Sequence, residues 1–338
     1  MKNIFVFVLG VVFLLGSYSC STDLDINAPY EEITVVYGLL NLSDSIQYIK
    51  VNKAYLSENR SAFLDAQEPD SLYHPDALRV QLVPFVNFSS GNAIVCELDT
   101  VSKESGVFAG PNQLLYRIPK NTNLNPSATY KLEVIKTSTD EVIASSSTAL
   151  VGDFNVTNPT VTAKVRLSRG NGIYNIFRLD WVVAENSELY EVEAKFSFIE
   201  KNKTSGAEAF KTVTWVITPG VSPTQSAGST FKLGALDGKN FFETVAKKVQ
   251  PNNNVDRILL NEMHLDFSVA EEQLATLIET SQPNTAVTQV KPQFSNIEGG
   301  VGIFSSRLTK RETRDMDDAT INELISGEIT GNLGFKKQ

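Results

Sequence analysis

The sequence predicts an all-β protein made of two sandwich-like domains, the second carrying a few appended helices. The main observation is a strand–turn–strand pattern from residue 33 onward, in which β-branched and apolar runs alternate with turn-forming residues. A chain of 338 residues also exceeds the length that one hydrophobic core usually holds. The pattern pauses at residues 150–159 and then restarts, which places the expected domain boundary there.

The first domain is expected over residues 31–150. Its first strand is predicted at 33–40, and the segment 41–45 (NLSDS) supplies a turn. The other strands predicted in this domain are 46–52, 78–86, 93–98, 113–118, 129–135 and 142–147. Neither face of 46–52 is uniformly apolar, so this strand is expected to be covered on both sides or to lie at an edge. Residues 57–75 are the longest stretch without a pattern, a length that is uncommon unless the loop is functional or disordered.

A local pattern before the strand at 129–135 resembles the corner that enters a late strand in fibronectin type III and related immunoglobulin-like sandwiches. Pro126 precedes Tyr130, and Leu132 and Val134 continue an alternating inward face. In such a corner the proline fixes a turn and the tyrosine ring folds inside, with its hydroxyl group bonded to the backbone. The resemblance implies an immunoglobulin/fibronectin-like sandwich.

The second domain is expected over residues 151–338. Strands at 174–181 and 189–196 resemble a fibronectin-like pair built around a core tryptophan; Trp181 is therefore expected in the core, and a sugar-stacking platform is the alternative. Further strands are predicted at 211–217, 229–233 and 258–269. Apolar residues at helical spacing predict helices at 238–249, 271–280 and 318–326, the last capped by Asp317 or Asp318 and followed by Gly327.

The N-terminus resembles a bacterial lipoprotein signal. Lys2 gives a short positive start, residues 4–16 form an uncharged apolar run, and small or polar residues lead to Cys20. The run is too short for a transmembrane helix, which needs about 20 apolar residues. The resemblance implies that residues 1–19 are a signal peptide, that Cys20 is lipidated, and that the polar residues 20–30 form a tether.

Charge and cysteine content argue against several function classes. A net charge of −9 without a basic stripe disfavours nucleic acid as a partner. The densest basic cluster, residues 307–314 (RLTKRETR), contains a glutamate and is expected to be a solvated surface. With Cys20 lipidated, Cys96 has no disulfide partner and is expected to be a buried, inert thiol. A catalytic cysteine would need His74 or His264, the two histidines of the chain.

Residues 294–304 (FSNIEGGVGIF) form the most distinctive motif. Its glycines suggest a phosphate cradle, but no Gly-Lys-Ser/Thr sequence follows, so a bulge or tight hairpin with positive φ is favoured. The motif, the lipid cysteine and the early strand ending at Gly38 resemble a family of Bacteroidota outer-membrane lipoproteins of unknown function. The resemblance implies an envelope lipoprotein, often encoded near TonB-dependent outer-membrane transporters, and brings no catalytic residue or cofactor.

Catalytic and metal templates find little support. Glu262, His264 and Asp266 alternate on one predicted strand and are metal-ligand types, although a polar strand face in water accounts for them equally well. The acidic residues within 315–318 are interpreted as helix caps rather than as a calcium loop. Paired carboxylates for glycoside hydrolysis depend on a three-dimensional distance, so that alternative stays open. No catalytic, cofactor-binding or metal-binding residue is therefore assigned.

These patterns together predict a lipid-anchored cell-envelope protein that acts as a non-enzymatic binding or accessory subunit. The expected partners are the outer membrane, through Cys20, and a TonB-dependent transporter or a glycan, with the loop 57–75 as the contact. Asp23 and Asp25 resemble acidic export signals, so the periplasmic and the cell-surface face of the outer membrane are both considered. The alternatives are a surface hydrolase using paired carboxylates and a structural or adhesive assembly subunit with exposed edge strands.

Overall fold

The computed structural model describes residues 33–54, 64, 66–68, 72–74, 77–104, 106, 109–120, 122–282 and 294–337. Within them the chain is predominantly β, as the sequence predicts. The signal peptide, Cys20 and the tether lie outside the described residues, as does most of the loop 57–75. Among the described helices, none has both the length and the apolar character that crossing a membrane requires.

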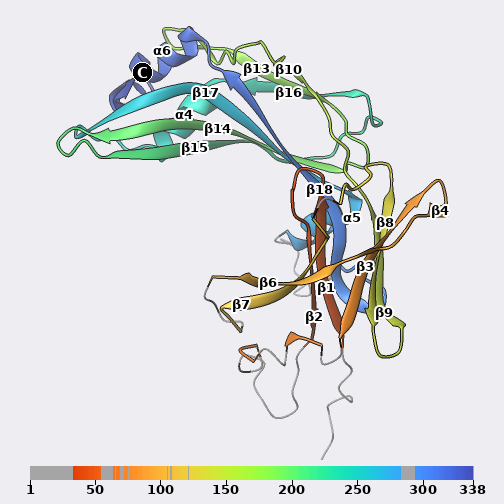
Figure 1. The fold of residues 1–338 in the computed structure, drawn as a ribbon. Helices are drawn as coiled ribbons and strands as arrows, with labels where there is room; N and C mark the ends of the chain where they lie inside the picture. Colours follow the sequence, from red (N-terminus) through yellow and green to blue (C-terminus); the bar gives the residue numbers. More distant parts are fainter. Residues whose placement is uncertain are drawn as a thin grey trace, which may run out of the picture.

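The first lobe is a pair of packed sheets (Figure 1). Its strands are β1 (Thr34–Asn41), β2 (Tyr48–Lys53), β3 (Leu78–Val86), β4 (Ser89–Ser90), β5 (Ile94–Val95), β6 (Glu97–Ser102), β7 (Asn112–Arg117), β8 (Thr129–Lys136) and β9 (Glu141–Ala149). One sheet runs β1-β2-β7-β6, and the other runs β4-β3-β8-β9 with β5 also paired to β3. Alternating apolar residues, such as Val36, Ile49, Val80 and Leu132, fill the space between them and are fully buried.

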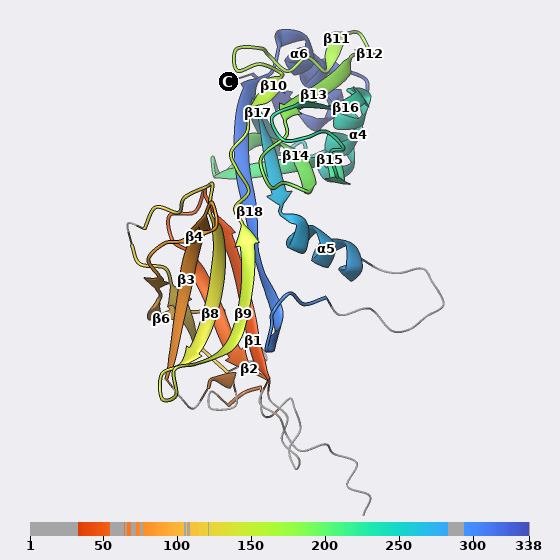
Figure 2. The ribbon, with the colours of Figure 1, turned by 90° about the vertical axis from the view of Figure 1, so that its right-hand side faces the viewer.

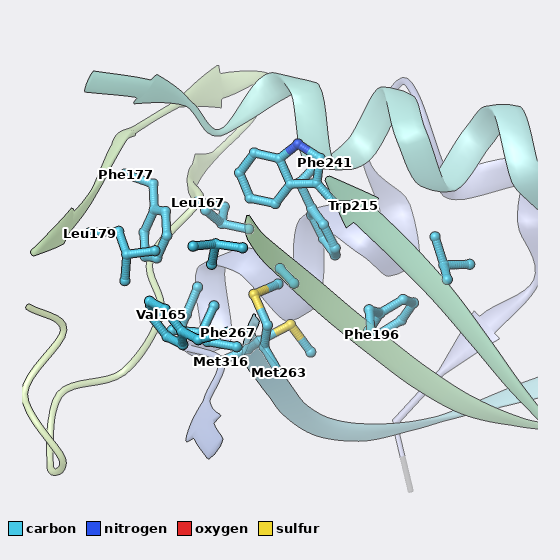
Figure 3. Packing of buried hydrophobic residues seen from close by; sticks show 14 of the residues in the cluster. Val165, Leu167, Phe177, Leu179, Phe196, Trp215, Phe241, Met263, Phe267 and Met316 are labelled. Atoms are coloured by element: carbon cyan, nitrogen blue, oxygen red, sulfur yellow. The ribbon is translucent and has the colours of Figure 1, made fainter. Parts of the chain in front are cut away.

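The second lobe packs a small sheet and helices onto a larger sheet. Its first elements are β10 (Val156–Asn158), β11 (Ser168–Gly170), β12 (Ile173–Tyr174), β13 (Ile176–Val182), β14 (Leu189–Asn202), β15 (Glu208–Val221) and β16 (Thr230–Asp237). They are followed by α4 (Lys239–Lys248), β17 (Val255–Ala270), α5 (Glu272–Ser281), β18 (Gly300–Asp315), α6 (Asp318–Ser326), η1 (Gly331–Leu333) and β19 (Phe335–Lys336). The sheet β10-β13-β16 faces β14, β15 and β17 across a core rich in aromatic side chains (Figure 3). In this core the Phe177 and Trp215 rings lie 6.3 Å apart between centroids.

The long strand β18 belongs to both lobes. Residues 300–307 pair in parallel with β1, and residues 307–315 pair antiparallel with β17. A single nine-stranded sheet therefore runs through the molecule in the order β15-β14-β17-β18-β1-β2-β7-β6, with β19 beside β17. Figures 1 and 2 show β18 passing from the lower lobe into the upper one. The lobes are thus joined by strand pairing as well as by the chain connection.

Several local predictions are confirmed. The Asn125 backbone N–H donates to the Tyr130 hydroxyl oxygen at 2.6 Å, as expected for the corner. Trp181 is fully buried, in agreement with the core interpretation. The three predicted helices correspond to α4, α5 and α6, and the Asp317 side chain caps α6 by accepting from the Thr320 N–H at 2.9 Å.

The basic cluster 307–314 is only partly the solvated surface that we expected. It lies within β18, so its residues alternate between two faces: Arg307 and Arg311 are exposed, whereas Leu308 and Arg314 are buried. The Arg314 guanidinium group donates to the Glu312 carboxylate at 2.9 Å and to the Pro159 carbonyl oxygen at 3.2 Å. These contacts allow a charged side chain to lie inside the lobe.

Candidate functional site

The main candidate site is a groove on the open face of the large sheet, over β14, β17 and β18 near the junction of the two lobes. It consists of two adjoining hollows of about 510 and 280 Å³ that share Glu191, Ser268 and Thr309. We call it the bend groove. Its polar floor also contains Glu193, Lys195, Asp266 and Arg311, and its other end is lined by Leu39, Leu189, Leu274, Ile278 and Arg307.

Strand register brings these side chains together. Glu193 is paired with Asp266, which is in turn paired with Arg311 on β18. The next row along the strands is Glu191, Ser268 and Thr309. Because successive side chains of a strand point to opposite faces, the residues between them belong to the buried core. Polar residues on one face and apolar residues on the other therefore place the groove floor in solvent.

The charges in the floor neutralise one another. Arg311 makes a bidentate contact with Asp266, from Nε to Oδ1 at 2.6 Å and from Nη2 to Oδ2 at 2.7 Å. Lys195 Nζ lies 2.8 Å from Asp266 Oδ2 and 3.6 Å from a Glu193 carboxylate oxygen. Burial opposes the ionisation of Asp266, but the hydrogen bonds from Arg311 and Lys195 outweigh it and lower its pKa. Asp266 is therefore held as a carboxylate and is unsuited to act as a general acid at neutral pH.

The apolar end of the groove is formed by helix α5, which packs on the ends of β14 and β17. Leu274 and Ile278 of the helix lie against Leu189 and Ala270. Glu271 fixes the start of the helix, since its carboxylate accepts from the Gln273 N–H at 3.0 Å and from the Ser305 hydroxyl group at 2.7 Å. Burial raises the pKa of Glu271 despite these hydrogen bonds. The helix is thus attached to β18, the strand that both lobes share.

The glycine motif at 294–304 has a structural role in the first lobe. The Asn296 side chain bonds the Phe304 backbone twice, donating to its carbonyl oxygen at 2.7 Å and accepting from its N–H at 3.0 Å. Glu298 forms a two-bond bridge with Ser145 of β9, at 3.0 and 2.8 Å. The segment before β18 therefore connects β1 to the free edge of β9, so that it links the two sheets of this lobe.

The glycines are required by close backbone contacts. Gly302 has φ +122°, and a Cβ atom there would lie 1.9 Å from the Val36 carbonyl oxygen. At Gly299, with φ +72°, a Cβ atom would lie 2.4 Å from the Ile143 carbonyl oxygen. The predicted positive φ is present at Gly299 and Gly302, but the expected bulge or tight hairpin is not: β18 pairs with β1 in parallel and in unbroken register, and the glycines allow close approach of the neighbouring backbone.

The other residues singled out in the sequence are not brought together into a site. Cys96 is buried, and burial raises its pKa to about 12, which makes it a poor nucleophile. His264 Nδ1 lies 2.8 Å from the Thr313 hydroxyl group, while Asp266 on the same strand is engaged by Lys195 and Arg311. His74 Nε2 lies 3.2 Å from the Asn52 carbonyl oxygen. Within the described part of the chain, no cluster of three or more His, Cys, Asp or Glu side chains is arranged to hold a metal ion.

The bend groove was missed in the sequence because its residues come from three strands far apart in the chain. Each strand alone shows the signal, a polar residue at every second position, as in Glu191, Glu193 and Lys195. The pairing that sets those rows side by side depends on strand register, which the alternation within one strand does not specify.

Comparison with known proteins adds no family. A scan against protein-family models finds no match, and a search of curated proteins finds none either. The lipoprotein resemblance thus rests on the sequence motifs alone, and the site must be interpreted from its own geometry.

Proposed function

We propose that this chain is a lipid-anchored cell-envelope protein that acts as a non-enzymatic binding or accessory subunit. Cys20 carries the lipid and holds the protein at the outer membrane, on its periplasmic or cell-surface face. The bend groove is the observation that carries the proposal, because it offers an open surface beside the strand that joins the lobes.

The chemistry of the groove favours a protein segment as the bound partner. Its floor alternates acidic and basic side chains, whereas Leu39, Leu274 and Ile278 provide an apolar end. A polypeptide supplies both kinds of complementary side chain, with apolar residues for the pocket and polar residues for the rim. A TonB-dependent transporter is the partner class that the sequence resemblance implies. A glycan is the second candidate, since the Ser268 and Thr309 hydroxyl groups suit sugar hydrogen bonds.

We also infer that both lobes are variants of the immunoglobulin/fibronectin-like sandwich. The corner at Tyr130 supports this for the first lobe. In the second lobe the Ala184 N–H donates to the Tyr190 hydroxyl oxygen at 2.8 Å, and the Tyr190 ring lies 5.3 Å from that of Trp181. A buried tryptophan beside a tyrosine whose hydroxyl group bonds the backbone is typical of such sandwiches.

Site-specific photocrosslinking in native membranes tests the proposed function. A photoreactive amino acid replaces Ser268, an exposed residue of β17 in the groove floor, and separately replaces Ser147, an exposed residue of β9. Ser147 is a matched control, because it is also a strand serine but lies away from the groove. We expect Ser268, and not Ser147, to crosslink to one other envelope protein in amounts comparable to the chain itself.

Other outcomes would favour the alternatives. Crosslinking of Ser268 to a second copy would support an assembly subunit. Hydrolysis of an envelope glycan that is abolished by Glu191→Gln or Glu193→Gln would overturn the non-enzymatic proposal. The anchor is tested separately, since incorporation of radiolabelled palmitate should be lost in Cys20→Ser; retained label would contradict a lipid on Cys20.

A further inference from the structure

A second cavity lies on the outer face of the first lobe and shares no lining residue with the bend groove, although Tyr37 of the cavity and Leu39 of the groove follow one another on the same face of β1. It has a volume of about 360 Å³ and is lined by Val35 and Tyr37 of β1, Lys50 and Asn52 of β2, and Tyr73. Tyr37 and Lys50 are direct partners across the two strands, as are Val35 and Asn52. Strand pairing therefore sets the floor of this cavity, which we call the lysine cavity.

The charged residues among the described lining of the lysine cavity are all of one sign. Lys50, Lys53 and Lys103 line it, and no Asp or Glu is among the described residues around it. Lys50 and Lys53 form no ion pair with any acid that the structure describes. In a chain of net charge −9, a cluster of lysines without a lining carboxylate is unexpected.

Lys50 is held in a place that disfavours its charge. Its side chain is partly buried, and burial followed by the nearby Lys103 lowers its pKa. Such a cation gains from an anion that enters, because the ligand would supply a neutralising charge that none of the described lining residues supplies.

The remaining lining is apolar or aromatic. Val35, Leu72 and Ala109 contribute hydrocarbon surface, and Tyr37 and Tyr73 contribute rings. Tyr73 is fixed in place, since its hydroxyl oxygen accepts from the Leu114 N–H at 3.1 Å. An inorganic ion would leave this surface uncovered, whereas a ligand with an apolar body would bury it.

We propose that the lysine cavity binds a small organic carboxylate, with its apolar or aromatic body over Tyr37 and Tyr73 and its carboxylate at Lys50. The site is distinct from the bend groove and does not depend on the proposed function. It assigns the chain a small-molecule ligand in addition to a macromolecular partner.

Titration calorimetry on the full chain tests this, using 2-naphthoate and the neutral analogue 2-naphthamide in matched detergent solution. The two probes share the naphthalene ring and have head groups of similar size, one an anionic carboxylate and the other a neutral amide. We expect the acid to bind at least about tenfold more tightly than the amide, since a hydrogen bond to a charged group provides that difference. Lys50→Met should remove this preference, while Lys50→Arg should keep most of it.

Lys131→Met is the matched control. Lys131 lies on β8 in the other sheet and pairs with Glu133 at 2.9 Å, so its loss should leave naphthoate binding unchanged. Equal affinities for acid and amide, binding of neither, or an unchanged preference in Lys50→Met would each overturn the proposal. Circular dichroism confirms that every variant is folded before it is titrated. If Lys50→Met fails to fold, Lys53→Met takes its place, and we expect it to weaken the preference for the acid over the amide.

Discussion

The bend groove and the lysine cavity are both hollows on open sheet faces, but their charges are arranged in opposite ways. In the groove, one carboxylate, Asp266, is contacted by both Lys195 and Arg311. In the cavity, Lys50 has another lysine as its charged neighbour and no acidic partner among the described residues. Neutralised charges stabilise the fold, whereas charges of one sign cost stability unless a ligand balances them. The difference therefore separates a surface whose charges are balanced within the protein from one whose described charges a ligand would balance.

The largest expected effect concerns β18, on which both regions depend. Gly302→Ala places a Cβ atom against the Val36 carbonyl oxygen at a residue with φ +122°. We expect it to lower the free energy of unfolding by about 3 kcal/mol or more. The two tryptophans, Trp181 and Trp215, both lie in the second lobe. A shift of the tryptophan fluorescence transition in denaturant would therefore show that the lobes unfold as one unit.

Gly228→Ala is the control for that variant. Gly228 also has positive φ, +82°, but a Cβ atom there would meet nothing within 4 Å. We expect it to cost only about 1 kcal/mol, the cost of the backbone conformation alone. If the two alanine variants lost equal amounts of unfolding free energy, the close backbone contact at Gly302 would contribute nothing to stability. The role of β18 in joining the groove to the cavity would then be unsupported.

The second largest expected effect concerns the bend groove, where the charges neutralise one another. Asp266→Asn leaves two cations without their shared carboxylate, and we expect a loss of about 1–2 kcal/mol in denaturant unfolding. The matched control is Asp140→Asn, which breaks the ion pair with Arg79 on an aspartate whose side chain is 76 % exposed. That change should cost less than about 0.5 kcal/mol. If Asp266→Asn were as stable as the wild type, the interpretation that the groove charges stabilise the fold would be wrong.

A change of opposite sign is expected in the cavity. Lys50→Met removes a partly buried cation that has a like charge as neighbour, so we expect stability to rise by about 0.5–1 kcal/mol. Lys131→Met, which breaks an ion pair, should leave stability unchanged or slightly lower it. The same denaturant titration measures both. If Lys50→Met were less stable than the wild type, Lys50 would stabilise the fold, and the cavity would resemble the groove in this respect.

Local patterns in the sequence predict much of the fold. The strand expected at 78–86 is β3 as observed, and the three helices occur where apolar spacing and capping residues indicate them. These features depend on neighbouring residues, which one sequence contains. The mixed pattern of 46–52 also has a physical explanation, since the outward residues Lys50 and Asn52 of β2 line the lysine cavity. An irregular strand face was thus the one local sign of that site.

Long-range pairing could not be predicted in the same way. Residues 307–314 show a charged pattern typical of a surface, and nothing near them indicates that β18 pairs with β1 at one end and β17 at the other. The groove floor could not be predicted for the same reason, because Glu193, Asp266 and Arg311 become neighbours only through strand register. Local patterns therefore gave signs of single strands in both candidate sites, but not the pairing that brings those strands together.

The smallest expected effect is the pH dependence of the stability changes caused by Asp266→Asn and by Lys50→Met. The pKa of Asp266 is lowered in the folded protein, so its stabilising contribution is complete above the unfolded value of about 4 and is lost as the pH falls through the folded value. The pKa of Lys50 is also lowered, so the cost of its charge is complete at neutral pH. That cost disappears as the pH rises through the folded value towards about 10.

Unfolding titrations at several pH values measure both effects in the same variants. The difference between wild type and Asp266→Asn should be constant from about pH 5 to 8 and should shrink below about pH 4. The gain from Lys50→Met should be constant near neutrality and should shrink on the alkaline side. A gain that instead grows as the pH falls through about 4 would indicate a carboxylate near Lys50, because its protonation would remove the charge that balances the lysine at neutral pH. It would mean that the cavity is neutralised like the groove, and the contrast between the two regions would no longer hold.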